Sequence, residues 1–326
     1  MAISSLENLL DSDLYMVLQS IGMGDLDMAK EFTRSFCEAN FDILPEDLTQ
    51  WVIQRLDESS SPYHLPPEIE TLVVMEDVTQ TFNPNRYYVS EREYKLLDEI
   101  IGLRESSELL ANAKIPFANT TLLFGPPGVG KTQFGRYLAY MLNLPFVYVD
   151  LCRVVGAQLG ETGKNLQNIF NFVSKTPCLF MLDEIDAMGA NRGTISNGGS
   201  GDEMTRTTIA LMQCMDRLPQ NVVLIAATNR QDMLDAALRR RFSIKHEFKH
   251  FLPDELVNMV INYLEDVIET GNLSLEWSVE DIRSQCSIST SQSDLISLTN
   301  RAIVRAVRTD HIIKLKEEDR RQRISR

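Results

Sequence analysis

The segment GPPGVGKT at residues 125–132 has the residue types and spacing needed to hold the phosphates of a nucleotide. Its glycines let the backbone turn N–H groups inward onto one anion, and the amino end of the helix expected after it adds a positive field. Lys131 supplies a positive charge for the β- and γ-phosphates, and the Thr132 hydroxyl is a magnesium ligand. The sequence therefore predicts a nucleoside triphosphate and Mg²⁺ as cofactors. The residues predicted to bind them are Gly125, Pro126, Pro127, Gly128, Val129, Gly130, Lys131, Thr132, Gln133 and Asp183.

Two adjacent acids, Asp183 and Glu184, end a later apolar run in the text CLFMLDEIDAM. At the carboxyl end of a buried strand, Asp183 would hold Mg²⁺ through water, beside Thr132, and Glu184 would polarise the water that attacks the phosphate. Acids in this position are also common at the start of a helix, where they carry no catalytic role. Because the phosphate loop precedes them, they predict hydrolysis and not binding alone.

Polar residues at two further places complete the predicted catalytic set. Asn229 ends the apolar run VVLIAATN, where its amide would orient the same water or touch the γ-phosphate, although Asn is also a favoured helix cap. Arg239, Arg240 and Arg241 stand together in LDAALRRRFS. Adjacent guanidiniums repel one another unless an anion receives them, and arginine suits a transferring phosphoryl group. A surface patch paired with acids of the same chain is the alternative interpretation.

The elements that must position these residues alternate between strands and helices. Amphipathic stretches separate the apolar runs, and the stretch after the phosphate loop places Phe134, Leu138 and Leu142 on one helical face. This alternation is typical of a parallel sheet covered by helices on both faces. We therefore predict an α/β fold with a parallel sheet of five strands, at residues 121–124, 146–149, 179–182, 222–227 and 244–248.

The sequence before and after these strands predicts smaller helical parts. Residues 1–58 alternate helical patterns with breakers and form an acidic helical amino-terminal domain, and residues 59–86, rich in Pro, Ser and Asn, form a linker. The large α/β nucleotide-binding domain then spans residues 87–252. A small helical lid domain follows at residues 253–310, and a charged tail at residues 311–326 is expected to be a frayed helix.

Charge is distributed unevenly along the chain. Residues 1–85 hold 16 Asp and Glu against 3 Lys and Arg, so they carry −13 of the net charge of −14. An acidic domain repels phosphate backbones, which argues against non-specific nucleic-acid binding through this part. Two interpretations stay open for it: recruitment of a partner with a basic surface, or an acidic face that is merely solvated.

Cysteine usage and hydropathy indicate the compartment. The five cysteines are odd in number and show no metal-ligand spacing, so we expect buried thiols in a reducing environment. The text contains no apolar run long enough to span a membrane, and its amino terminus carries acids where a signal peptide carries bases. We therefore expect a soluble, cytoplasmic protein without a membrane partner.

These motifs together resemble the AAA+ ATPases over about residues 90–308. GPPGVGKT is similar to the family's Walker A motif, LDEID to its Walker B and ATN to its sensor 1. The arginine box, with FLP shortly after it, is most similar to that of the katanin and spastin group. The segment SQSDLISLTNRAIVRAV resembles the second-sensor helix of the family's lid.

The resemblance implies ATP as the nucleotide and a homo-oligomer, expected to be a hexameric ring. In such rings each site lies at a subunit interface, and arginines of the neighbour complete it. By that similarity Arg240 and Arg241 are the fingers, while Glu184 and Asn229 act on the water within the chain. The implied activity is ATP hydrolysis by a motor that remodels or unfolds a protein partner, recruited as substrate or through an adaptor by the amino-terminal domain.

One position departs from the family pattern. Members that thread a polypeptide carry an aromatic residue shortly before a segment that this chain matches at Gly160, Glu161, Thr162 and Lys164. The position of the aromatic residue is occupied by Gln158 in this chain. Without a flat apolar ring, grip on a threaded chain is expected to be weaker. An ATP-dependent switch or loader acting with a nucleic-acid or effector complex, for instance in defence, is therefore the second hypothesis, although nucleic acid is the less favoured partner.

Overall fold

The computed structural model describes residues 16–17, 20, 26–39, 49, 52, 65–115, 117–156, 161–188, 200–286, 291–309 and 311–314. The chain divides into two compact units, Met1–His64 and Leu65–Arg326. In the first unit, α3 (Leu26–Ala39) is a helix, as the spacing of Met28, Phe32 and Phe36 predicts. Pro45, followed by two acids, also predicts a helix start, and it lies outside the described residues.

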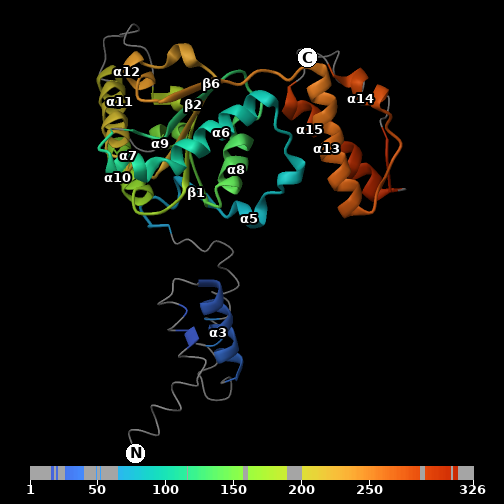
Figure 1. The fold of residues 1–326 in the computed structure, drawn as a ribbon, viewed down its shortest axis with the longest axis horizontal. Coiled ribbons are helices and arrows are strands. Elements are labelled where there is room, and N and C mark those ends of the chain that lie inside the picture. Colours follow the sequence, from blue (N-terminus) through green and yellow to red (C-terminus); the bar gives the residue numbers. More distant parts are fainter. Residues whose placement is uncertain are drawn as a thin grey trace, which may run out of the picture. The chain divides into compact units, whose positions relative to one another are not determined.

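The second unit contains a six-stranded sheet in the order β1-β3-β4-β5-β2-β6 (Figure 1). The five predicted strands are confirmed, and all pairings among them are parallel. They are β2 (Thr120–Phe124), β3 (Phe146–Asp150), β4 (Leu179–Asp183), β5 (Val223–Thr228) and β6 (Ile244–Glu247). Because the strands run in the same direction, their carboxyl ends meet at one edge of the sheet, where ligands bind in open α/β folds.

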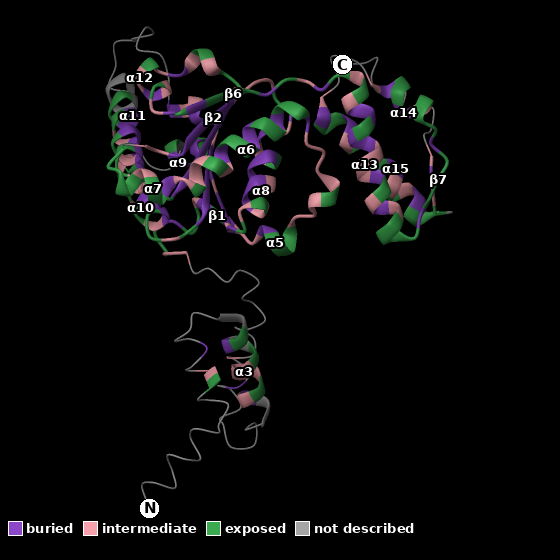
Figure 2. Cartoon of the chain, in the orientation of Figure 1, coloured by how far each residue is buried: buried purple, intermediate pink, exposed green. Residues whose placement is uncertain are grey.

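Helices cover both faces of the sheet, so β2, β4 and β5 are buried almost throughout (Figure 2). On one face Met181 and Phe146 pack with apolar residues of α6 (Glu91–Glu105) and α8 (Lys131–Met141). On the other face Phe180 meets Phe170 of α10 edge to face, with ring centroids 5.2 Å apart. The further elements of this region are α7 (Ser107–Asn112), α9 (Leu151–Gly156), α10 (Thr162–Val173), η2 (Ile185–Met188), α11 (Ser200–Asp216), η3 (Gln231–Met233) and α12 (Ala236–Arg239).

The linker predicted at residues 59–86 is wrong for its second half. Residues 65–86 contain β1 (Val73–Glu76), α5 (Val78–Thr81) and η1 (Pro84–Arg86), and β1 pairs antiparallel with β3 as a sixth strand. Val73 and Met75 are buried while Val74 between them is 52% exposed, the alternation expected of an edge strand. The apolar run was short and surrounded by loop-forming residues, so its pairing with a strand more than seventy positions away was not visible locally.

Helices α13 (Pro253–Gly271), α14 (Val279–Gln285) and α15 (Gln292–Arg308) form the lid around a core of its own. The prediction that the lid is helical throughout is wrong, because β7 (Ser274–Leu275) and β8 (Ile312–Ile313) pair in parallel within it. Ile313 is fully buried in the lid core, so the tail predicted from residue 311 begins later than expected. Residues 315–326 of that tail lie outside the described residues.

Candidate functional site

The loop at residues 125–130 follows β2 directly and leads into α8, the strand-loop-helix setting that a phosphate loop needs. Gly125 has φ +145°, and a Cβ added there would lie 2.0 Å from the carbonyl oxygen of Phe248. Gly128 has φ +76°, a conformation that is unfavourable for residues other than glycine. The loop therefore requires glycine at these two positions for backbone reasons, independent of any ligand.

Lys131, the first residue of α8, is buried, with 7% of its surface exposed. Its Nζ donates to the carbonyl oxygens of Gly125 and Pro126, each at 2.9 Å, and to Asn229 Oδ1 at 2.7 Å. Burial lowers the pKa of its ammonium, and the negative charge of Asp183, among others, opposes that shift. The structure thus brings the predicted cation and the predicted amide of β5 into direct contact.

Thr132 and Asp183, the two predicted metal residues, also lie side by side. The hydroxyl of Thr132 donates to Asp183 Oδ2 at 3.0 Å, so two oxygens from separate elements converge beside the phosphate loop. Tyr148 of β3 donates its hydroxyl to the same oxygen at 3.3 Å. Burial raises the pKa of Tyr148 to about 12, and the neighbouring Asp183 adds to the shift, so the phenol stays protonated as a donor.

Glu184 leaves the strand in an unusual conformation, with φ +54°. Its backbone N–H donates to Asp183 Oδ1 at 2.9 Å, and its exposed side chain points to Cys152, whose Sγ donates to Glu184 Oε2 at 3.2 Å. Burial raises the pKa of the Cys152 thiol to about 11, with the bond to Glu184 as the next cause, so it remains a neutral donor at neutral pH. A left-handed non-glycine residue at this point aims the carboxylate away from the line of the strand.

Asn229 follows β5, where Thr228 fixes the backbone. The Thr228 hydroxyl donates to Asp186 Oδ1 at 2.6 Å and accepts from the Arg230 N–H at 2.9 Å. Acids and amides from β4 and β5 therefore meet the loop after β2 at one edge. This set of one buried cation, paired hydroxyl and carboxylate oxygens and a second, exposed carboxylate suits a magnesium-bound triphosphate, because magnesium prefers oxygen ligands and the loop offers N–H groups to phosphate.

Comparisons with known proteins agree with this geometry. Residues 121–250 match the model of the family described as "ATPase family associated with various cellular activities (AAA)". The chain contains an AAA ATPase module. The crystal structure of the FIGL-1 AAA domain has the same fold, with a TM-score of 0.56 and 21% identity over 80% of this chain and 87% of that one. Its complex with ADP matches similarly, with 20% identity.

Curated relatives of the AAA module come from several kinds of protein. A 26S proteasome regulatory subunit 8 homolog from Naegleria fowleri is 31% identical over 66% of this chain and 54% of its own length. An ATP-dependent zinc metalloprotease FtsH from Pelodictyon phaeoclathratiforme is 34% identical over 67% of this chain and 34% of its length. The chain thus spans between about a third and about half of the length of these two relatives.

The arginine box of the AAA module separates into distinct environments. Arg241 is held within the chain: its Nε and Nη2 donate to the two oxygens of Asp216 at 2.8 and 2.9 Å, and its Nη1 donates to the Ala237 carbonyl. Arg240 is exposed, and its guanidinium makes no ion pair or hydrogen bond within the described parts of the chain. Arg239 is half-buried at the end of α12. Within the described residues, no hydrogen bond or ion pair joins the side chain of any of the three to the phosphate loop.

The lid of the AAA module reaches the phosphate loop through the start of α15. The Ser293 N–H donates to the Gly128 carbonyl at 3.1 Å, and a Cβ added at Gly128 would lie 2.6 Å from Ser293 Oγ. Ser291 caps α15 by accepting from the Asp294 N–H. The segment that resembles the second-sensor helix is therefore next to the predicted nucleotide site.

Some site residues were missed by sequence reasoning, and some predicted ones cannot be placed. Tyr148 and Cys152 were not singled out, although alternation along β3 points Tyr148 to the same face as Phe146 and Asp150. Gln158 and the neighbouring residues 157–160 lie outside the described residues. Among the helices that the structure describes, none has the length and apolar character needed to cross a bilayer.

Proposed function

We propose that this chain is an ATP-hydrolysing AAA+ motor that assembles as a ring and remodels a protein partner. The observation that carries the proposal is the convergence of Lys131, Thr132, Asp183, Glu184 and Asn229 at the carboxyl edge of one sheet. These side chains come from three different strand ends, so their meeting follows from the fold and not from their proximity in the sequence.

In the proposed reaction, each group has a separate task. The loop N–H groups and Lys131 bind the β- and γ-phosphates, where they stabilise the charge that develops as the terminal phosphate leaves. Thr132 and Asp183 would hold Mg²⁺, which when bound neutralises phosphate charge. Glu184 orients and polarises the attacking water, and Asn229, already bonded to Lys131 Nζ, is placed to contact the γ-phosphate or that water.

The proposed ring accounts for the arginine box. Lys131 is the cation that the described residues place at the phosphate loop, and in the proposed ring a neighbouring copy supplies a second one. Arg240 is exposed and makes no ion pair within the described parts of the chain, whereas Arg241 is bound by Asp216. Of the two predicted fingers, Arg240 is therefore better placed to act across an interface. Arg241 would position it by anchoring the end of α12 to α11.

Remodelling of a protein is proposed from the relatives, which include a proteasome regulatory subunit and a metalloprotease. A third relative, named "Ribosome biogenesis ATPase RIX7", from Saccharomyces cerevisiae, is 37% identical over 51% of this chain and 20% of its own length. We further propose that the acidic amino-terminal unit recruits the partner, since residues 1–64 hold 12 Asp and Glu against 3 Lys and Arg and so carry −9 of the net charge of −14.

The second candidate is an ATP-dependent switch or loader acting with a nucleic-acid or effector complex. Gln158 favours it, because an amide grips a threaded chain less well than an aromatic ring. Turnover distinguishes the two: stimulation by DNA or RNA, and by no protein, would support the switch. Stimulation by an unfolded polypeptide would support the motor.

The test of the proposed function is the variant Glu184→Gln. It keeps the shape of the side chain but cannot polarise water as a carboxylate does, so we expect ATP turnover to fall by about 10²-fold or more, while ATP binding persists. Binding would be followed by titration with a fluorescent ATP analogue, and turnover by phosphate release. The stalled variant should also retain its partner in a pull-down.

Lys131→Ala is the matched control, because it removes the phosphate-binding cation itself. Glu184→Gln should bind nucleotide and fail to hydrolyse it, whereas Lys131→Ala should fail to bind. Turnover in Glu184→Gln at the wild-type rate would remove this residue from the proposed chemistry. Nucleotide binding by Lys131→Ala at wild-type affinity would contradict the assignment of the whole loop.

A further inference from the structure

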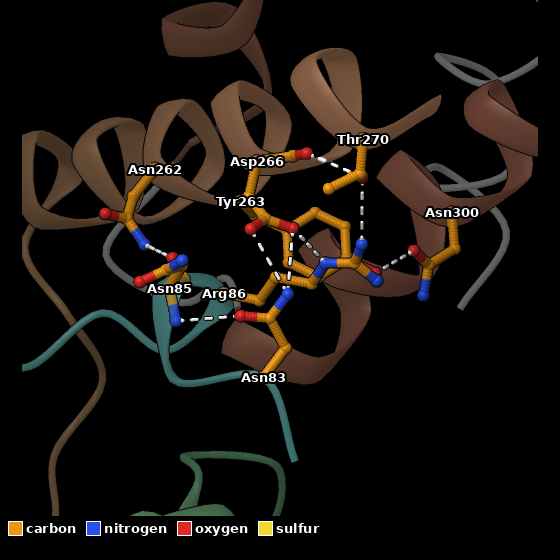
Figure 3. A network of polar contacts seen from close by, with 8 residues as sticks. All are labelled: Asn83, Asn85, Arg86, Asn262, Tyr263, Asp266, Thr270 and Asn300. Carbon is orange, nitrogen blue, oxygen red and sulfur yellow. Dashed lines mark hydrogen bonds and ion pairs between the residues drawn. The ribbon is translucent and has the colours of Figure 1, made fainter. Parts of the chain in front are cut away.

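A short segment ahead of α6 contacts the lid far from it in sequence. Asp266 of α13 accepts from Arg86 Nε at 2.6 Å, and its two oxygens accept from Asn83 Nδ2 at 3.2 and 3.1 Å (Figure 3). Asn262, one turn earlier on α13, donates to the carbonyl oxygen of Asn85. We call residues 82–88 the strap. The side chains of Asn83 and Arg86 face α13, as the dashed contacts in Figure 3 show.

Asp266 is the centre of these contacts and is poorly solvated, with 9% of its side chain exposed. The bond from the Arg86 guanidinium holds the pKa of this carboxyl below its usual range. The Arg86 guanidinium also lies 5.9 Å from the centre of the Tyr263 ring and donates to Thr270 Oγ1 at 3.4 Å. A carboxylate with this little solvent is costly to leave without its donors, so the strap and α13 separate only with difficulty.

The other side of the strap is apolar and binds α8. Tyr87 stacks on Tyr137 with ring centroids 4.7 Å apart, and Phe82 lies 6.3 Å from both Tyr137 and Tyr140. Because α8 begins at Lys131, these rings rest on the helix that carries the phosphate loop. Phe82 and Tyr87 therefore contact the large domain, while the polar side chains of the strap contact α13. Tyr88 also meets the lid core, where its ring packs edge to face on Phe251 at 5.6 Å.

A series of contacts within the lid connects the strap to the nucleotide site. Tyr263 of α13 donates its hydroxyl to Asn300 Oδ1 of α15 at 2.7 Å, and both helices share one buried core. The start of α15 in turn meets the phosphate loop, where the Ser293 N–H donates to the Gly128 carbonyl. Movement of α13 away from the strap would therefore carry Ser293 away from Gly128.

We propose that the strap positions the lid over the phosphate loop, and that Asn83, Arg86 and Asp266 are positioning residues that slow nucleotide release. The proposal rests on the proposed function in one respect, the binding of nucleotide at residues 125–132. Opening the lid requires the Arg86–Asp266 ion pair and the two Asn83 contacts to break together. Loss of the ion pair should therefore favour the open lid, from which nucleotide leaves.

The experiment measures release of N-methylanthraniloyl-ADP from the full chain by stopped-flow fluorescence. We expect Arg86→Ala to release it about tenfold faster than wild type, a factor that corresponds to about 1.4 kcal/mol. Asp266→Asn should also release labelled ADP faster than wild type. Arg86→Lys retains a cation without the planar guanidinium, so it should release labelled ADP at a rate between those of wild type and Arg86→Ala. Once ATP is bound, the single-turnover rate of hydrolysis should change little, because no group of the strap touches the site.

The control variant is Lys95→Ala on α6. It also removes a cation from an ion pair, but Lys95 and Glu91 are exposed neighbours on one helix and do not touch the lid. Release from this variant should equal wild type. Thermal unfolding of each variant would show that all are folded. The double variant Arg86→Ala with Asp266→Asn should speed the release of labelled ADP by less than the two single changes combined, because both remove the same contact.

Two failures can be told apart. If wild type and Lys131→Ala bind the labelled ADP equally, the proposed nucleotide site is wrong, whatever the strap does. If wild type binds and Lys131→Ala does not, but Arg86→Ala and Asp266→Asn release at the wild-type rate, the strap has no positioning role. Slower release from either strap variant would likewise overturn the proposal, because it would mean that the contact favours the open lid.

Discussion

The edge of the sheet and the strap are two polar clusters that arise in different ways. At the sheet edge, Lys131, Asp183 and Asn229 occupy the ends of parallel strands or the loop after one, so the sheet's register alone brings them together. In the strap, Arg86 meets Asp266 across 180 positions of sequence, through packing of a short segment on a helix.

The difference teaches where each property of the module resides. Residues on strand ends are fixed by a framework buried on both faces, which suits chemistry that depends on precise distances. Contacts between the strap and the lid depend on one ion pair, whose Arg86 side chain is partly exposed, and on a few amides, and these can break without unfolding the core. We therefore expect the sheet edge to control the chemical step and the strap to control the residence time of nucleotide.

The largest expected effect concerns the cation that, in the proposed ring, a neighbouring copy supplies to the sheet edge. Arg240→Ala should lower ATP turnover by about 10³-fold, since a finger supplied in trans is worth about 10³ to 10⁵ in rate. Mixing it with Lys131→Ala subunits should restore part of the activity, because the intact Arg240 of one copy then meets the intact site of the other. Phosphate release would be measured across mixing ratios.

Arg241→Ala provides the comparison within the same box. Its guanidinium binds Asp216 within the chain, so the change should lower the unfolding free energy by about 1 kcal/mol and weaken turnover less than Arg240→Ala does. Equal losses in the two variants, without any rescue on mixing, would count against a site completed by a neighbour.

Tyr148→Phe sharpens the comparison from inside the sheet. It removes one hydroxyl from Asp183 Oδ2 and leaves the ring in place. We expect the Mg²⁺ concentration for half-maximal turnover to rise about tenfold, since loss of a bond that orients a metal-binding carboxylate typically costs 10- to 100-fold in affinity. Metal-free release of labelled ADP should stay at the wild-type rate, which is the reverse of the pattern expected for Arg86→Ala. An unchanged Mg²⁺ requirement would show that Tyr148 does not orient Asp183 for metal binding.

The smallest effect is expected at Glu93 on α6, away from both clusters. Burial raises the pKa of this carboxyl to about 7 from 4.5, so the fold favours its protonated form. The resulting stability is fully present below pH 4.5 and is lost as the pH rises through about 7. Glu93→Gln keeps an acceptor for the Ser90 N–H without a charge, and should raise the unfolding free energy by about 1–3 kcal/mol near pH 8.

Denaturant unfolding at several pH values would measure this gain, which should shrink as the pH falls toward 4.5. A gain that is the same at every pH would mean that the charge of Glu93 is not its cause. Because Glu93 belongs to neither cluster, turnover and ADP release should match wild type at neutral pH.

Local patterns in the sequence were sufficient for the parallel strands and for the groups at their ends. Each of the five strands is an apolar run, and the phosphate loop directly follows the first of them, β2. Tyr148 was not predicted because its hydroxyl matters only through Asp183, which belongs to the adjacent strand. Periodicity identifies buried positions but not which of them carries a hydrogen bond to a neighbour.

The strap and β1 could not be predicted for a related reason. Asn83, Pro84 and Asn85 are typical of a loop, and nothing near them in the sequence indicates a partner on α13. The burial of Val73 and Met75 likewise depends on β3, which supplies the pairing partner. Both features are set by contacts between distant segments, so they become visible only once the sheet and the lid are placed.

The position of β1 at the end of the sheet has a practical consequence for any shortened form of this protein. A fragment starting at residue 87 would leave one side of β3 with unpaired backbone N–H and C=O groups, which recruit strands from other molecules. Such a fragment would tend to self-associate through its open edge, and that aggregation could be mistaken for the assembly of a ring. Fragments that begin at or before residue 65 keep the edge closed.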